Sequence, residues 1–309
     1  MKRLFFYWVL LLSGGLNAAE FDYGLKPQQV APDVHVFVGR TEDFTPGNGG
    51  NIVNTGFIAA PGGNIVIDSG SSRRYGEQMR QAIFGISPKP MALVINTHHH
   101  PDHFLGNQAF ADTPIGALAG TRQGIGSDGN AFAENLYGMV GECMKGTEVF
   151  APTQTLTAGM LEVAGRRLRL IALHGHTEAD LVIYDETSGV LFASDLVFND
   201  RAPTTPHANI EHWLAALDQL EAITREAGFK VLVPGHGQVA RDATPIHKTR
   251  AWLVWLRQTL RESAAAGLDM NDVLARPLPP EFAKLPVAAS EYRRSVGHLF
   301  PAAELEALK

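Results

Sequence analysis

Residues 96–106, NTHHHPDHFLG, place four of the chain's 12 histidines within six positions. They directly follow residues 91–95, the apolar run MALVI, which has the length and composition of a buried strand. Side chains two positions apart in an extended segment point the same way, so His98 and His100 can bind one ion together. The intervening His99 then points elsewhere. This stretch therefore predicts a metal site at the end of a strand.

The second half of the same stretch supplies two further ligand types, Asp102 and His103. Both follow Pro101, a residue that favours the first turn of a helix. A helix that begins here can direct the two side chains to the other side of the same pocket. One short loop thus offers ligands for two adjacent ions.

Three more candidate ligands stand at the ends of apolar runs elsewhere in the chain. They are His176 in HGHTEAD, Asp195 in LFASD and His236 in VPGHG. The end of a strand is where a rigid sheet can present side chains to a shared cleft. Imidazole and carboxylate groups suit zinc, with iron or manganese as alternatives.

We predict a centre with two Zn²⁺ ions, a bridging water and a separate set of ligands for each ion. The first ion is assigned to His98, His100 and His176, the second to Asp102, His103 and His236, and Asp195 bridges the two. Bound zinc lowers the pKa of its water from ~15.7 to about 7, which makes hydroxide available at neutral pH. Asp102 is predicted to orient this hydroxide and to pass its proton to the leaving group, so Asp102 and Asp195 are the predicted catalytic carboxylates.

Several other residues are candidates for supporting roles. Asp68 follows the apolar residues 65–67 and is expected to support the metal ligands, although it can instead cap the following turn through Ser71. Arg201 and His207, in FNDRAPTTPH, are candidates for substrate contact at the mouth of the cleft. The alternative for this segment is a proline-rich connector that caps a helix. Tyr292 and Arg293 are similar candidates near the C-terminus.

The remaining patterns indicate alternating strands and helices. We expect strands within residues 34–57, 65–68, 168–173, 181–184, 190–193 and 230–233, and helices over 73–86, 211–227 and much of the chain after 246. Residues 120–150 are rich in glycine and support no assignment. Two successive strand-and-helix halves favour helices packed outside two sheets.

The ligand pattern resembles that of the metallo-β-lactamase-fold hydrolases over roughly residues 30–240, where H-x-H-x-D-H follows a strand and G-H-T, a strand-end Asp and G-H-G come later. The resemblance implies an α/β fold, a four-layer αββα sandwich with a C-terminal helical tail. A bridging Asp195 is similar to the metal set of the glyoxalase II-type thioesterases, lactonases, phosphodiesterases and persulfide dioxygenases, so the ligand set also leaves a single-iron dioxygenase open. The implied reaction is cleavage of a small thioester, ester or lactone.

The sequence outside the metal-ligand motifs resembles the exported quinoprotein relay-system zinc metallohydrolases. This part includes residues 23–58, YGLKPQQVAPDVHVFVGRTEDFTPGNGGNIVNTGFI. That resemblance implies a periplasmic accessory role near dehydrogenases that depend on pyrroloquinoline quinone (PQQ). Two alternatives stay open. The metal cleft could hydrolyse β-lactams, or the protein could be a non-catalytic carrier or assembly factor for a quinoprotein system.

Composition and the N-terminal residues indicate which class of partner and which cellular compartment to expect. The formal charge of −6 argues against a nucleic-acid partner. A small-molecule substrate is what the resemblance to the metallo-β-lactamase-fold hydrolases implies. Lys2 and Arg3 precede an apolar run and then Ala18 and Ala19, the layout of a secretory signal peptide. We therefore expect a signal peptide over 1–19, a catalytic domain over 20–245 and a helical extension over 246–309. After cleavage no membrane anchor is expected.

Overall fold

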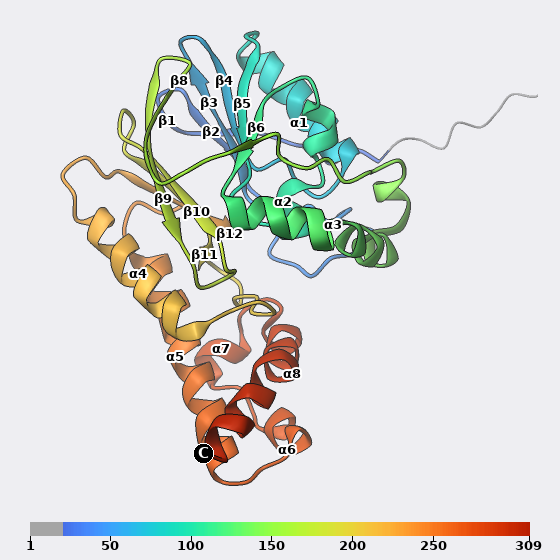
Figure 1. Ribbon diagram of the computed structural model, residues 1–309, viewed down its shortest axis with the longest axis vertical. Helices are drawn as coiled ribbons and strands as arrows, with labels where there is room; N and C mark the ends of the chain where they lie inside the picture. Colours follow the sequence, from blue (N-terminus) through green and yellow to red (C-terminus); the bar gives the residue numbers. More distant parts are fainter. Residues whose placement is uncertain (1–20) are drawn as a thin grey trace, which may run out of the picture.

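The computed structural model describes residues 21–309, so the expected signal peptide at 1–19 lies outside the described residues. Two β-sheets face each other, and helices cover the outer face of each (Figure 1). The predicted four-layer αββα sandwich is thereby confirmed. The expected domain boundary at residue 245 falls in the first turn of the helix that leads into the C-terminal extension.

The first sheet has seven strands in sequential order. They are β1 (Gln28–Ala31), β2 (Val34–Phe37), β3 (Thr55–Ala60), β4 (Gly63–Ile67), β5 (Met91–Ile95), β6 (Ile115–Ala117) and β7 (Gln154–Thr155). β1 to β4 are antiparallel, and β4 to β7 run parallel. Parallel strands end at one edge of a sheet, so the residues after β4 and β5, including Asp68 and His98, lie together.

The second sheet has five strands in the order β12-β11-β10-β9-β8. They are β8 (Gly159–Val163), β9 (Arg166–Leu173), β10 (Asp180–Asp185), β11 (Val190–Phe198) and β12 (Val231–His236). β11 and β12 are parallel, which brings Asp195 and His236 to neighbouring positions. A strand was expected over residues 190–193; β11 instead continues to Phe198 through an irregularity at Ser194, whose φ is +48°.

Alternation of side chains across the strands divides the core into layers. In β4, Ile65 and Ile67 pack between the two sheets, whereas Val66 packs outward beneath a helix. In β10, Leu181 and Ile183 face the first sheet, and Val182 and Tyr184 face the helices on the other side. Strands buried on both faces are expected to be continuously apolar, as these are.

The helices form the two outer layers and the C-terminal extension. They are α1 (Arg73–Ile86), α2 (Pro101–Phe104), α3 (Ala119–Val140), α4 (Ile210–Thr224), α5 (Thr244–Ala265), α6 (Met270–Ala275), α7 (Pro280–Ala283) and α8 (Ala288–Ala307), with 3-10 turns at Asn107–Phe110 and Gly141–Met144. Ser72 caps α1 by accepting from the amide of Tyr75, and Asn209 caps α4 by accepting from the amide of His212.

The glycine-rich segment that supported no assignment contains α3, a helix of 22 residues. Glycine in a helix costs up to about 1 kcal/mol relative to alanine, which is why the sequence did not indicate one. Packing explains the choice at Gly124, where a Cβ atom would lie 2.8 Å from the His99 ring. The missing side chain lets α3 lie close against the histidine loop.

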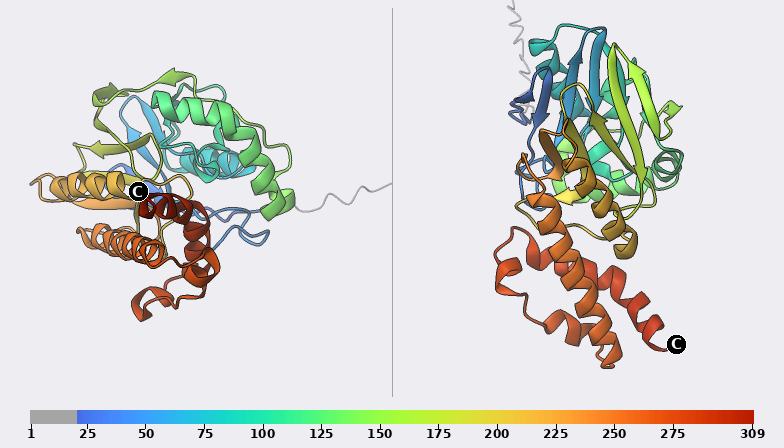
Figure 2. Two further views of the ribbon diagram at one scale, coloured as in Figure 1. Left: turned by 60° about the horizontal axis from the view of Figure 1, so that its bottom comes forward. Right: turned by 90° about the vertical axis from the view of Figure 1, so that its left-hand side faces the viewer.

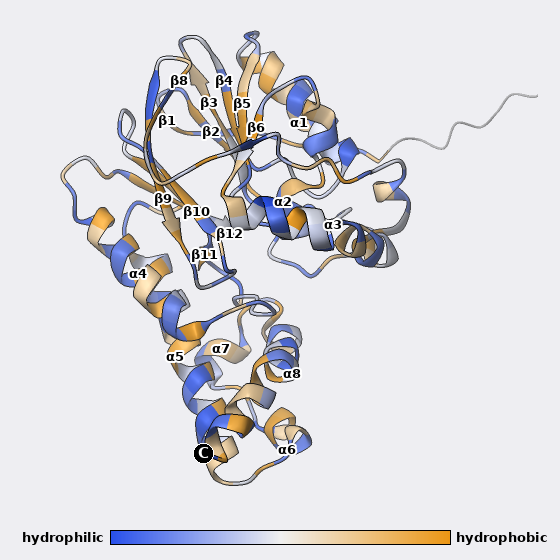
Figure 3. Cartoon of the chain, viewed as in Figure 1, coloured by the Kyte–Doolittle hydropathy of each residue, from blue (hydrophilic) through white to orange (hydrophobic). Residues whose placement is uncertain are grey.

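Most of the C-terminal extension projects beneath the sandwich (Figures 1 and 2). Its helices α5 and α8 pack together and bury Trp252, Tyr292 and Phe300 in the same core as α4. Figure 3 shows apolar strands inside and mixed hydropathy along the helices, as expected for helices with one buried face. Among residues 21–309, no helix combines the length and apolarity needed to cross a bilayer.

A buried ion pair on the second sheet gives a prediction about stability. Arg166 Nη2 lies 2.7 Å from Asp185 Oδ2, and the two side chains are 6% and 0% exposed. We expect Asp185→Ala to lower the free energy of unfolding by about 3–5 kcal/mol, because the buried guanidinium loses its partner. Urea denaturation measures this change.

The nearby pair Arg167–Glu162 is the matched control, since its side chains are 62% and 77% exposed. Glu162→Ala should change the unfolding free energy by less than about 1 kcal/mol. Equal effects of the two substitutions would contradict the prediction.

Candidate metal centre

The histidine loop leaves the sheet at the end of β5 and turns at once into α2. Extended backbone at His100 and the single helical turn that follows place His98 and His100 on one side and Asp102 and His103 on the other. All four side chains are buried. The loop therefore has the two-sided arrangement expected from its spacing, although the helix is only four residues long.

Two groups of potential ligands lie side by side. Within each group, the ligand atoms all lie within 4.8 Å of one another; the groups are His98, His100, His176 and Asp195, and Asp102, His103 and His236. Nδ1 of His100 and Nε2 of His176 are 2.8 Å apart. These are the seven residues named from the sequence, and the two groups correspond to the two ligand sets proposed there.

Asp195 contacts members of both groups. Its Oδ1 lies 3.1 Å from Nε2 of His103, and its Oδ2 lies 3.2 Å from Nε2 of His236 and 3.4 Å from Nε2 of His176. The neighbouring strand makes room for this carboxylate at Gly235, where a Cβ atom would lie 1.9 Å from Oδ1. Asp195 thus occupies the position required of a bridging ligand.

Hydrogen bonds to the second ring nitrogen orient the imidazoles. Nδ1 of His103 donates to Asp68 Oδ2 (2.8 Å), and Nδ1 of His236 donates to the carbonyl oxygen of Ile52 (2.7 Å). Each bond leaves Nε2 free to bind an ion. Asp68 also accepts from the amide and hydroxyl of Thr97, both at 2.8 Å. This is the supporting arrangement expected for Asp68.

Burial and charge set the protonation of the centre. Burial lowers the pKa of His98 and His100 well below the usual value and that of His176 to about 3. These imidazoles are therefore neutral at physiological pH, which is the form that binds metals. Burial opposes the charge of His103 too, but the carboxylates of Asp195, Asp68 and Asp102 outweigh it and raise the pKa of His103 well above 6.5.

The donor set fits a pair of divalent cations. Nε2 of His98, Nε2 of His103 and Oδ1 of Asp195 are buried, and none makes a hydrogen bond of acceptable geometry to any of residues 21–309. Buried polar atoms are nearly always satisfied, so atoms that share one small space without hydrogen bonds indicate an ion. Imidazole with carboxylate is the ligand chemistry of zinc.

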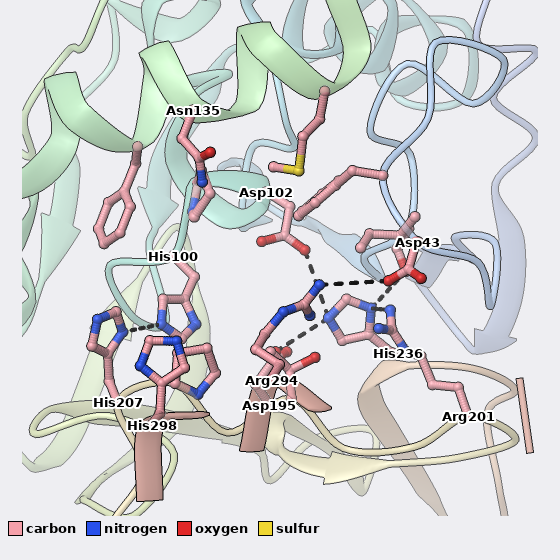
Figure 4. Close-up of a pocket in the computed structure, with 17 residues that line it drawn as sticks. Asp43, His100, Asp102, Asn135, Asp195, Arg201, His207, His236, Arg294 and His298 are labelled. Carbon is pink, nitrogen blue, oxygen red and sulfur yellow. Dashed lines mark hydrogen bonds and ion pairs between the residues drawn. The ribbon is translucent and has the colours of Figure 1, made fainter. Parts of the chain in front are cut away.

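The centre opens on a cavity of about 360 Å³ (Figure 4). His100, Asp102, Asp195 and His236 form its floor, so ligands of both groups reach the cavity. Apolar and polar side chains from several elements form the walls, among them Phe44, Phe132, Met139, Asp43, Arg201, His207, Arg294 and His298. The volume lies in the range typical of small-molecule sites.

Arg201 and His207, expected at the cleft mouth, both line this cavity. The Arg201 side chain is nevertheless 1% exposed, and its Nη2 donates to Glu291 Oε1 (2.8 Å). That burial favours a supporting role over direct contact with substrate. His207 is exposed, and its Nδ1 lies 2.8 Å from Nε2 of His100.

His207 gives a prediction about metal affinity. Its contact with Nε2 of His100 holds the ring so that Nδ1 faces His176, and loss of such a partner typically weakens metal binding 10–100-fold. We expect His207→Ala to weaken zinc binding by about this factor, as measured by competition with a chromogenic chelator. His298→Ala removes a cavity histidine without a bond to a ligand and should leave affinity unchanged.

Tyr292 and Arg293, the candidates for substrate contact near the C-terminus, do not line this cavity. Tyr292 is buried and donates to the carbonyl oxygen of Val273, and Arg293 is exposed outside the cavity. The residues of α8 that reach the cavity are Arg294 and His298. The helical spacing of Glu291, Arg294 and His298 could have indicated one common face, but not the cavity that it meets.

Comparison with known proteins is consistent with this geometry. A family model described as "Metallo-beta-lactamase superfamily" matches residues 48–236. A linear primary-alkylsulfatase from a Pseudomonas species is 23% identical over 287 residues, covering 78% of this chain and 53% of that protein. A hydroxyacylglutathione hydrolase from a Synechococcus species is 28% identical over 134 residues, covering 43% of this chain and 45% of that protein. The chain thus spans about half the length of these curated relatives.

Solved structures share the fold. A metallo-beta-lactamase from Pontibacter korlensis superposes with a TM-score of 0.60 at 21% identity and covers 74% of this chain and 99% of its own. The metallo-beta-lactamase IND-7 superposes with a TM-score of 0.59 at 18% identity and covers 74% of this chain and 98% of its own. At these identities the likeness shows the fold alone.

Proposed function

Because the chain belongs to the metallo-beta-lactamase superfamily, we propose that it is a metal-dependent hydrolase that cleaves a small thioester, ester or lactone. The observation that carries the proposal is the convergence of seven imidazole and carboxylate side chains in two adjoining groups, four of which, His100, Asp102, Asp195 and His236, line one cavity. The similarity to a hydroxyacylglutathione hydrolase supports the thioester class.

The residues of the chain have distinct tasks in this proposal. Two divalent ions, zinc by preference, would lower the pKa of water to about 7 and polarise the bond to be cleaved. Asp102, whose Oδ2 lies 3.6 Å from Nε2 of His236, accepts the proton of the attacking water and returns it to the leaving group. Asp195 contacts imidazoles of both groups and so fixes their positions relative to each other. Phe44, Phe132 and Met139 exclude bulk water from one side of the cavity.

Sulfate-ester hydrolysis is a second candidate. It is favoured by the alkylsulfatase, whose match covers 78% of this chain, against 43% for the hydroxyacylglutathione hydrolase. As Lewis acids, the same ions would also polarise an oxygen of a sulfate ester. β-Lactam hydrolysis, the alternative raised by the sequence, is consistent with the shared fold but has no residue of its own in its favour.

One panel of substrates separates these activities. Zinc-loaded protein is assayed with S-benzoyl thioglycolate, γ-thiobutyrolactone, 4-nitrophenyl acetate, 4-nitrophenyl sulfate and nitrocefin. We expect turnover of a thioester or lactone that is abolished by a chelator and restored by zinc. Turnover confined to the sulfate would select the second candidate, and turnover confined to nitrocefin the third. No turnover of any compound, with tight binding of PQQ, would support the carrier hypothesis instead.

The cellular setting is also part of the proposal. The signal-peptide pattern supports export to the periplasm, and the sequence resemblance supports a functional link to PQQ-dependent dehydrogenases. Cell fractionation with N-terminal sequencing tests export and should find a mature chain that begins after Ala18 or Ala19. A gene deletion that leaves PQQ-dependent alcohol oxidation unchanged would contradict the link.

A further inference from the structure

The outer wall of the cavity comes from a part of the chain outside the family match. Arg294 and His298 lie on α8, whereas the match ends at residue 236. We propose that Arg294 binds an anionic group of the substrate, a carboxylate or a sulfate, at a distance from the bond that is cleaved. This inference rests on the proposed function and narrows its substrate class.

The position of Arg294 suits an anion-binding group. Its side chain is 35% exposed and lines the cavity beside Asp43 (Figure 4). Nη1 donates to Glu291 Oε1 (2.8 Å), which fixes the base of the guanidinium. Nη2 lies 3.7 Å from Asp43 Oδ1, beyond hydrogen-bond distance. A planar guanidinium held at one nitrogen can offer its other donors to a carboxylate or sulfate.

The two carboxylates that face Arg294, Glu291 and Asp43, are both shared with other donors. Glu291 is fully buried, and its Oε1 also accepts from Arg201 Nη2 and Thr204 Oγ1. One buried carboxylate is therefore shared by two guanidiniums. Arg201 cannot serve as the anion site, because its side chain is 1% exposed. Arg294 is thus the arginine of this cluster that a ligand can reach.

The same cavity limits the rest of the substrate. Phe44, Phe132 and Met139 provide an apolar wall, and the volume of about 360 Å³ admits a small molecule. The arrangement matches a compound with three parts: a cleavable group over the metal ligands, an apolar segment and an anionic end. A neutral analogue of equal size should bind less well.

A pair of matched thioesters tests the inference on the zinc-loaded full chain. S-benzoyl thioglycolate carries a carboxylate, and its methyl ester is the neutral counterpart; thiol release is followed with a disulfide reagent. We expect Arg294→Ala to raise KM for the carboxylate at least about tenfold, the effect of losing one hydrogen bond to a charged group, with little change in KM for the ester. Arg293→Ala, on the exposed side of the same helix, is the matched control and should change neither.

A second variant distinguishes anion binding by Arg294 from a purely structural role of this side chain. Asp43→Asn removes the carboxylate that competes for Arg294, so KM for the anionic thioester should fall while KM for its methyl ester stays constant. Arg294→Lys should retain part of the selectivity, because it keeps the charge but not the planar fork. Equal KM changes for both thioesters in Arg294→Ala, or none, would overturn the inference.

Binding measured without turnover separates this inference from the proposed function. Calorimetry compares phenylacetate, phenyl sulfate and neutral phenylacetamide on the zinc-loaded wild type and Arg294→Ala. Anion binding that depends on Arg294, with no thioester cleaved, would retain the anion site and reject the thioester activity. Cleavage of the thioester with no dependence of binding or KM on Arg294 would retain the thioester activity and reject the anion site. The preferred anion, carboxylate or sulfate, follows from the two affinities.

Discussion

Replacement of Asp102 by asparagine is expected to lower kcat by about 10²–10⁴-fold, the usual contribution of a general base. The substitution keeps the size of the side chain but removes the carboxylate that faces the cavity near His236 and His103. Steady-state kinetics on the most active substrate of the panel measures the loss. Metal analysis of the same sample distinguishes the loss of a proton acceptor from the loss of an ion.

Asp128 provides the control for this experiment. It lies on α3 near His99 and His207, is exposed and has no place on the cavity floor. Asp128→Asn should leave kcat within about twofold of the wild type, since substitutions at exposed positions rarely disturb a site. If Asp102→Asn behaved in the same way, the catalytic assignment of Asp102 would be wrong.

Replacement of Asp195 by asparagine is expected to weaken zinc binding by more than about 100-fold, beyond the usual effect of changing an outer partner of a ligand. Asp195 is the residue whose oxygens approach imidazoles of both groups, so both ions should be affected. Atomic emission should find about two zinc ions per wild-type chain and fewer in the variant. Cobalt substitution gives a second readout, because the visible spectrum reports ligand geometry.

The matched control is Asp200→Asn, five residues later. Asp200 is 45% exposed and pairs with Lys248. Its φ of +56° is a conformation that asparagine also adopts readily, so the backbone should not be strained. Zinc content and melting temperature should match the wild type. A variant of Asp195 that still held two ions with the wild-type cobalt spectrum would exclude its bridging position.

The local patterns predicted much of the fold because their physical causes are local. Residues 73–86 have a helical period and form α1 over those same residues. The helix expected over 211–227 is α4, Ile210–Thr224, which ends three residues earlier. α3 could not be predicted, because its glycines disfavour a helix in isolation and are explained by contacts such as Gly124 with His99.

The sequence by itself determined which residues could bind metal, because imidazoles and carboxylates at the ends of apolar strands are recognisable from spacing and strand period. It also determined the layered α/β fold. Only the tertiary structure decided that the ligand atoms of each expected group lie within 4.8 Å of one another, and that Arg294 of α8 reaches the same cavity. The physical reason is that these contacts join segments such as α8 and the loop at Asp43, about 250 residues apart, and no local pattern records which surfaces meet when helices and sheets pack.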